Sequence, residues 1–224
     1  MEATKKSKAK KLDSVSAQAI QLAYREYLLT EGKQPASVFK FCKENRMTEV
    51  EFYAHFASFE AIEKAIWQGY LADTKKRLES DEAFVQFSSR EKILTFYFSL
   101  AELLKTDRSF VLHQLKSVKN PASTPVFLKG FKASFEEWIN GVLNEGKGTG
   151  EIAKRPYLDD RYSRLFWTHL MFILKFWAKD ESPNFEKTDV AIEKSVTLAF
   201  DLIGKGVLDS ALDFGKFLYQ NSKN

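Results

Sequence analysis

The sequence predicts an all-α protein. The 224-residue chain contains only 10 Gly and 5 Pro, and no long stretch alternates apolar and polar residues as a half-buried strand does. Apolar residues recur instead at the three- and four-residue spacing of helices. A helix-starting capping box, in which glutamate follows serine or threonine by three residues, occurs at Thr48 and at Ser88. The length suits one large or two small domains with a sizeable core.

Residues 1–13 form a basic arm that we expect to be disordered. Five of these residues are lysines and no apolar segment follows them, so the arm is not a secretory signal. A basic arm ahead of a DNA-binding unit can lie along phosphates or in a minor groove, and it can equally serve as a solubilising tail. The sequence leaves both interpretations open.

Residues 20–56 predict three helices in quick succession. Apolar residues from Ile20 to Leu28 keep helical spacing, and Gly32 follows where a helix C-terminus favours glycine. A second short helix is expected from Pro35 through Glu44, and a third begins at the Thr48 capping box. Helix, turn and short capped helix is the layout that presents one helix to a DNA major groove.

This segment holds a set of residues at characteristic positions: Gly32, Ser37-Val38, Thr48, Tyr53-Ala54-His55-Phe56, Glu60 and Ile62. With these residues it resembles the DNA-binding domain of the TetR family of bacterial repressors. The resemblance covers the first third of the chain and implies a helix-turn-helix domain over residues 14–57.

The resemblance also implies which residues contact DNA. They lie on or beside the second and third expected helices: Ser37, Lys40, Arg46, Thr48, Glu49, Val50, Tyr53 and His55. The chain departs from the family pattern in the turn Asn45-Arg46-Met47 and at Phe59, where a lysine is common. Glu51 is explained as the capping partner of Thr48, whereas Glu49 either accepts from a cytosine amino group or repels phosphate.

A larger helical domain is expected over residues 58–224. Ser58 caps a long fourth helix that reaches about Ser80, and a looser link follows it. By composition, the glycine-rich stretch 146–156 is a loop. The remaining expected helices span 88–104, 110–118, 126–144, 160–179 and 188–204, with a shorter amphipathic segment from Leu208 to Tyr219.

The last two long helices are the expected dimer interface. The helix at 160–179 is apolar almost all round, and its successor has one apolar stripe opposite a polar one. TetR-like proteins dimerise through these helices, which lets two recognition helices read a palindromic operator. The alternative is a large monomeric core. The residues expected at the interface are Leu170, Leu174, Trp177, Ile192, Val196, Phe200 and Ile203.

The resemblance further implies ligand-responsive repression by an unknown apolar effector. Aromatic side chains can line an apolar pocket between helices, and they can equally be plain core. The candidate ligand-binding residues are Phe98, Phe131, Phe135, Trp138, Phe166, Trp167, His169 and Phe172. We expect neither a cofactor nor enzyme activity, because no metal-ligand spacing, nucleophile motif or phosphate-binding glycine loop occurs.

A second, shorter resemblance supports an alternative function. Residues 176–189 are similar to part of a mitochondrial ubiquinone-biosynthesis accessory protein with a TetR-like fold, which binds isoprenoid lipid and is not a repressor. The matching residues are Asp180, Ser182, Pro183, Phe185, Glu186 and Thr188. The alternative is therefore a lipid-binding accessory protein that no longer binds DNA specifically.

Composition favours a cytoplasmic protein. The single cysteine, Cys42, excludes an internal disulfide and suits a reducing compartment. The most apolar run, residues 165–177, is shorter than the roughly 20 residues that span a bilayer. The net charge of +4 permits nucleic-acid binding without requiring it.

Overall fold

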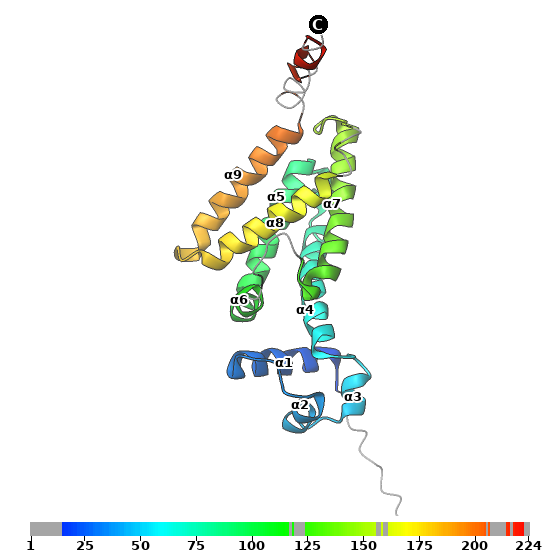
Figure 1. The fold of residues 1–224 in the computed structure, drawn as a ribbon, viewed down its shortest axis with the longest axis vertical. Coiled ribbons are helices and arrows are strands. Elements are labelled where there is room, and N and C mark those ends of the chain that lie inside the picture. Colours follow the sequence, from blue (N-terminus) through cyan, green and yellow to red (C-terminus); the bar gives the residue numbers. More distant parts are fainter. Residues whose placement is uncertain are drawn as a thin grey trace, which may run out of the picture. The chain divides into compact units, whose positions relative to one another are not determined.

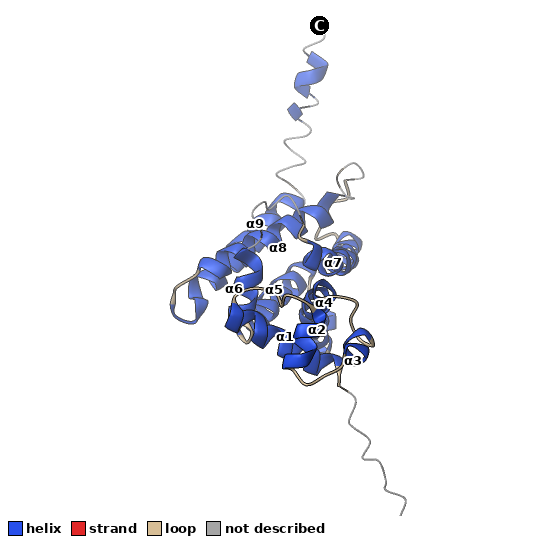
Figure 2. Ribbon diagram, turned by 60° about the horizontal axis from the view of Figure 1, so that its bottom comes forward, coloured by secondary structure: helices blue, strands red, loops and turns tan. Residues whose placement is uncertain are grey.

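In the computed structural model, the described part of the chain is built from helices and contains no strand (Figures 1 and 2). The chain divides into two compact units, Met1–Ile62 and Glu63–Asn224. The expected basic arm, residues 1–13, lies outside the described residues. Those are 15–116, 118, 124–155, 158, 161–204, 206, 214–215 and 217–221.

The first unit holds three helices and the start of a fourth. Their bounds are α1 Ala17–Glu31, α2 Val38–Glu44, α3 Glu49–Tyr53 and α4 Phe59–Glu79. Gly32 ends α1 in the left-handed conformation (φ 68°) and donates its N–H to the carbonyl oxygen of Leu28 at 2.9 Å, as its position in the sequence predicted.

Phe41 is the centre of the first unit's core. Its ring lies 6.1 Å from that of Phe52 on α3 and 5.5 Å from that of Phe59 on α4. Phe59 also stacks on Tyr24 of α1 at 5.4 Å. The departure from the family pattern at position 59 is thus a packing residue that joins all four helices.

The second unit is a body of longer helices. Helix α5 packs on α7 and α9, and α8 packs on α7 and α9 (Figure 1). The bounds beyond α4 are η1 Glu82–Gln86, α5 Ser89–Lys105, α6 Arg108–Lys116, η2 Val126–Leu128, α7 Lys129–Thr149, α8 Tyr162–Lys179, η4 Pro183–Phe185 and α9 Glu186–Ile203. None of the described helices is long and apolar enough to cross a membrane.

The structure corrects the predicted loop at 146–156. Helix α7 continues through Thr149 and ends at Gly150, which has a φ of 82°. Gly146 lies inside the helix, and a Cβ atom there would come within 2.6 Å of the Ser89 side chain and 2.7 Å of that of Ile152. Close packing, rather than a turn, therefore explains this glycine.

Candidate nucleic-acid interface and the α8–α9 face

Helix α3 begins with the capping box that the sequence predicted. The backbone N–H of Thr48 donates to Oε2 of Glu51 at 2.7 Å, and the N–H of Glu51 donates to Oγ1 of Thr48 at 3.2 Å. The hydrogen bonds from the backbone and side chain of Thr48 lower the pKa of the Glu51 carboxyl group. One of the two carboxylates on α3 is therefore engaged in holding the helix start.

The outer side of α3 is open to solvent. Val50 is 80% exposed and Tyr53 is 53% exposed, whereas Phe52 points into the core. All eight residues predicted to contact DNA are exposed in the single chain. Helix α3 thus offers a side that can enter a groove.

Two of the predicted phosphate-binding side chains have partners within the unit. Lys40 forms an ion pair with Glu44 at 3.7 Å, one turn along α2. Nε2 of His55 lies 2.7 Å from the carbonyl oxygen of Val15, so the ring donates there and ties the residues before α1 to the end of α3. Ser37 accepts from the N–H of Lys40 and caps α2.

Arg46 occupies the turn between α2 and α3 with a left-handed backbone (φ 55°). The next residue, Met47, donates its N–H to the carbonyl oxygen of Cys42 and closes the turn. A non-glycine residue in this conformation costs about 1 kcal/mol. The departure from the family pattern therefore places an exposed cation beside α3 in a strained position.

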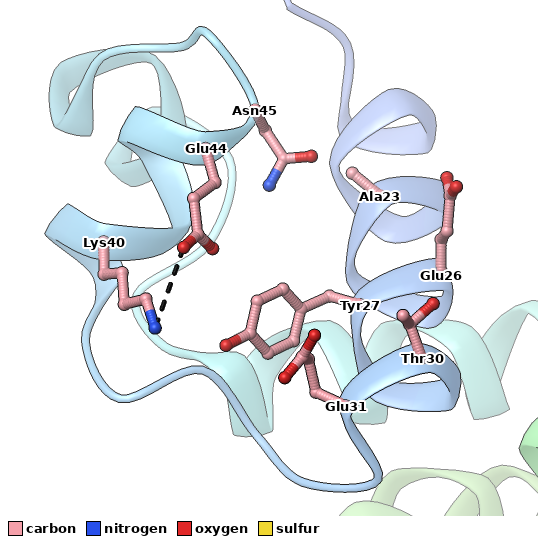
Figure 3. A pocket seen from close by; sticks show the side chains of 8 residues that line it. All are labelled: Ala23, Glu26, Tyr27, Thr30, Glu31, Lys40, Glu44 and Asn45. Carbon is pink, nitrogen blue, oxygen red and sulfur yellow. Dashed lines mark ion pairs between the residues drawn. The ribbon is translucent and has the colours of Figure 1, made fainter.

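A polar hollow of about 340 Å³ lies between α1 and α2 (Figure 3). Its lining consists of Ala23, Glu26, Tyr27, Thr30, Glu31, Lys40, Glu44 and Asn45. Among the described residues, no group of His, Cys, Asp and Glu side chains is placed to hold a metal ion. With three glutamates around one lysine, this hollow suits a phosphate less well than the outer side of α3 does.

The body carries a second surface feature, an apolar groove of about 780 Å³ between α8 and α9. Leu165, Leu198 and Leu202 are exposed along it. The full lining is Leu158, Arg161, Tyr162, Arg164, Leu165, Phe166, His169, Ser195, Leu198, Ala199, Leu202 and Ile203. We call this the α8–α9 groove.

His169 lies in the groove wall as a neutral imidazole. Ser195 Oγ donates to the carbonyl oxygen of Ala191 at 2.6 Å, so Nε2 of His169 donates to Ser195 Oγ at 2.7 Å. Nδ1 then accepts from the Tyr97 hydroxyl at 3.3 Å. Burial lowers the pKa of His169 to about 4. Both ring nitrogens of His169 therefore have hydrogen-bond partners within the protein.

The seven residues predicted for the dimer interface are all buried in the single chain: Leu170, Leu174, Trp177, Ile192, Val196, Phe200 and Ile203. The large apolar side chains that α8 and α9 expose are Leu165, Phe172, Val190, Leu198 and Leu202. The described structure therefore shows two sets of apolar residues on these helices, one inside the body and one facing solvent.

The predicted ligand-binding residues lie in more than one part of the body. Phe131, Phe135 and Trp167 pack ring on ring at 6.2 to 6.4 Å, and Phe96 stacks on Trp138 at 4.5 Å. Phe166 and His169 line the α8–α9 groove. Phe98 is half-buried, and Phe172 is exposed and contacts Phe176.

The stretch with the lipid-protein resemblance forms the corner between α8 and α9. Burial opposes ionisation of Asp180, but hydrogen bonds from Ser182 and Thr188 outweigh it and hold the pKa of Asp180 well below its ordinary value. These bonds comprise two backbone N–H groups and two hydroxyls, at 2.6 to 2.8 Å. They cap the start of α9.

Arg108 of α6 contacts residues on both sides of this corner. Its guanidinium lies 4.5 Å from the Trp177 ring and 4.4 Å from the Phe185 ring, and it donates to the carbonyl oxygens of Trp177 and Asp180. Such a cation between two rings stabilises the contact it joins. Asp180, Ser182, Phe185 and Thr188 therefore each have a structural role in the corner.

Comparisons with known proteins agree with this architecture. Residues 92–218 match the family model described as the tetracyclin repressor-like C-terminal domain. No match is found among curated proteins.

Solved structures share the fold over most of the chain. A candidate TetR-family transcriptional regulator from Syntrophomonas wolfei is 16% identical, with a TM-score of 0.67 over 85% of this chain and 96% of that one. One from Shewanella sp. PV-4 is 12% identical, with a TM-score of 0.60 over 84% and 97%. A bacterial regulatory protein in the TetR family from Rhodococcus RHA1 is 14% identical, with a TM-score of 0.55 over 85% and 98%. Because the family model matches more than half of the sequence, the chain belongs to the TetR family of transcriptional regulators.

Proposed function

We propose that this regulator is a homodimeric repressor that binds a palindromic operator and releases it when an apolar effector binds. The proposal rests on the exposed side of α3, which carries Val50 and Tyr53, and on the Thr48 capping box that fixes the start of this helix. An apolar contact from Val50 suits a thymine methyl group, and the Tyr53 hydroxyl can donate to a phosphate. Arg46 supplies a cation beside them.

The outward apolar side chains of α8 and α9 support the dimer. Leu165, Phe172, Val190, Leu198 and Leu202 are exposed on two neighbouring helices, whereas single exposed apolar residues are scattered on most protein surfaces. A second copy that covers this face would form a four-helix interface. Two copies of α3 held by it would read half-sites about one DNA turn apart.

A buried tryptophan on α4 supports effector binding in the body. Nε1 of Trp67 is buried, and no described residue accepts a hydrogen bond from it. The rings of Tyr70, Phe127 and Phe131 surround the indole at 5.6 to 5.9 Å. An unpaired buried N–H costs about 1 to 3 kcal/mol, so an apolar effector with one acceptor oxygen would gain by binding there.

Helix α4 is the element through which such an effector would act. It begins in the first unit at Phe59 and continues into the second. Two hydrogen bonds tie it to α6 and to the residue before that helix: Nε2 of Gln114 donates to Glu63 at 3.0 Å, and the Tyr70 hydroxyl donates to Asp107 at 2.8 Å. An effector that prefers one position of α4 would shift the population of dimers with the DNA-binding spacing.

A mobility-shift titration of the purified protein on the DNA upstream of its own gene tests the proposal. We expect sequence-specific retention that weakens steeply as salt rises, because phosphate contacts release counterions. The variant Val50→Glu should lose specific retention, while Leu22→Glu, at an exposed leucine of α1, should keep it. Equal, weak retention of every fragment would contradict the proposal.

The same preparation tests the lipid-binding alternative. Organic extraction followed by mass spectrometry would detect a carried isoprenoid lipid. Such a lipid, together with sequence-blind DNA retention, would favour the accessory-protein function over the repressor.

A further inference from the structure

The two carboxylates of α3 differ in their hydrogen bonding. Oε2 of Glu51 accepts from the N–H of Thr48 at 2.7 Å and from the hydroxyl of the same residue at 2.8 Å, so this carboxylate is engaged within the helix. Glu49 is exposed, and no described residue donates a hydrogen bond to it or forms an ion pair with it. The Glu49 carboxylate can therefore accept a hydrogen bond from a molecule outside the chain.

Glu49 and Val50 are the first two residues of α3, and both side chains face solvent. Val50 is the more prominent of the two, at 80% exposure, and it lies opposite the buried Phe52 on the helix. In a helix-turn-helix unit, the first residues of the second helix contact base edges in the major groove. The two side chains placed to meet bases are thus a carboxylate and an aliphatic group.

The pattern of donors and acceptors in the major groove decides which base suits a carboxylate. Cytosine presents its N4 amino group, which is a donor. Adenine presents an amino group beside the acceptor N7, guanine presents the acceptors N7 and O6, and thymine presents the acceptor O4. Because acceptor atoms repel a carboxylate, cytosine is the base that suits Glu49. The methyl groups of Val50 suit the methyl group of a thymine.

The composition of α3 gives it no side chain that would favour a purine instead. Bidentate contacts to guanine or adenine are made by Arg, Lys, Asn and Gln, and the helix contains none of these. Its exposed side chains are Glu49, Val50 and Tyr53, of which only the Tyr53 hydroxyl can donate. The exposed Arg46, in the turn before α3, supplies positive charge that offsets the repulsion between Glu49 and phosphates.

We propose that Glu49 reads a cytosine in each operator half-site, beside the base pair whose thymine methyl group contacts Val50. This base preference rests on the proposed function, because it requires α3 to lie in the major groove. Glu49 then determines specificity mainly by rejection, since an acceptor atom of any other base would face its negative charge. The operator half-site accordingly contains neighbouring cytosine and thymine bases.

Selection from a random pool of duplexes by full-length wild type, Glu49→Gln, Glu49→Ala and Glu26→Gln tests the preference. Glu26→Gln removes an exposed carboxylate of α1 and is the control matched in charge to Glu49→Gln. Wild type and this control should enrich one half-site with cytosine at the Glu49 position. Glu49→Gln should enrich adenine there, because an amide donates to N7 and accepts from the N6 amino group. Glu49→Ala should have no preference at that position and keep the others.

Mobility-shift titrations on the enriched half-site measure the size of the effect. Wild type should bind the cytosine duplex at least about tenfold more tightly than a duplex with thymine at that position, where O4 replaces the amino group. Glu49→Ala should bind the two duplexes about equally. Circular dichroism checks that each variant is folded.

Identical half-sites from wild type and both Glu49 variants would overturn the preference and leave the proposed function standing. So would an equal gain in affinity for every duplex in both variants, because Glu49 would then only repel phosphate. A wild-type pool with no preferred sequence would contradict the proposed function itself, and the preference with it.

Discussion

The helix-turn-helix unit and the α8–α9 face are built from contacts of very different range. In the first unit, the Thr48 capping box spans three residues and the Gly32 helix end spans four. On the α8–α9 face, His169 bonds to Tyr97 and Arg108 bonds to Asp180, each across about seventy residues. Local signals therefore specify the exposed helix α3, whereas long-range packing decides which side of α8 and α9 faces solvent.

A charge on the free side of α9 should have the largest effect. Leu198→Glu would bury an unpaired carboxylate twice in a two-fold dimer and raise its dissociation constant about a thousandfold. Leu22→Glu, at a leucine of similar exposure on α1 (63% against 59%), should leave the dimer unchanged. Sedimentation equilibrium measures both. Equal effects from the two variants would remove the distinction between the surfaces.

Acid should weaken the body through His169. Its pKa in the folded state, about 4, lies below the ordinary 6.5, so the unfolded chain binds more protons between these values. The stabilisation is complete above pH 6.5 and is lost as the pH falls towards 4, by about 2 to 3 kcal/mol. Urea unfolding at pH 7 and pH 4.5 measures it. His169→Gln should show a correspondingly smaller difference between the two pH values, and an unchanged difference would contradict the role of this residue.

The corner between α8 and α9 should tolerate substitution less well than an exposed cap. Asp180→Ala removes the acceptor of four hydrogen bonds and should lower the free energy of unfolding by about 2 kcal/mol. Asp81→Ala removes one exposed bond, to the N–H of Ala83, and should cost about 0.5 kcal/mol. Urea unfolding compares them, and similar losses would mean that the corner does not hold α9.

The turn of the first unit should gain stability when its strain is removed. Arg46→Gly relieves the left-handed backbone and should raise the free energy of unfolding by about 1 kcal/mol. Arg46→Ala keeps the strain and removes the charge. Both variants should bind DNA less tightly than wild type, with a smaller salt dependence. If only one of them lost affinity, the backbone rather than the charge would govern binding.

The sequence predicted the fold class and the helix starts well, because a capping box or a helix-ending glycine leaves a mark within a few residues. It could not predict that α7 runs through Gly146, because the residue there is glycine to leave room for the side chain of Ser89 on α5. It assigned Ile192 and Val196 to a partner, because an apolar stripe does not reveal which neighbour covers it. That Leu198 and Leu202 stay exposed depends on how α9 packs on α5 and α8, which the sequence does not reveal.

In the proposed function, a pair of α3 helices reads a two-fold DNA sequence. Selection of bound duplexes from a random pool by the wild-type protein, followed by sequencing, tests this reading of DNA. We predict enrichment of a palindrome whose half-sites lie about one helical turn apart, and loss of that enrichment in Leu198→Glu. A bound pool with no preferred sequence, or a single half-site bound equally well by both proteins, would contradict it.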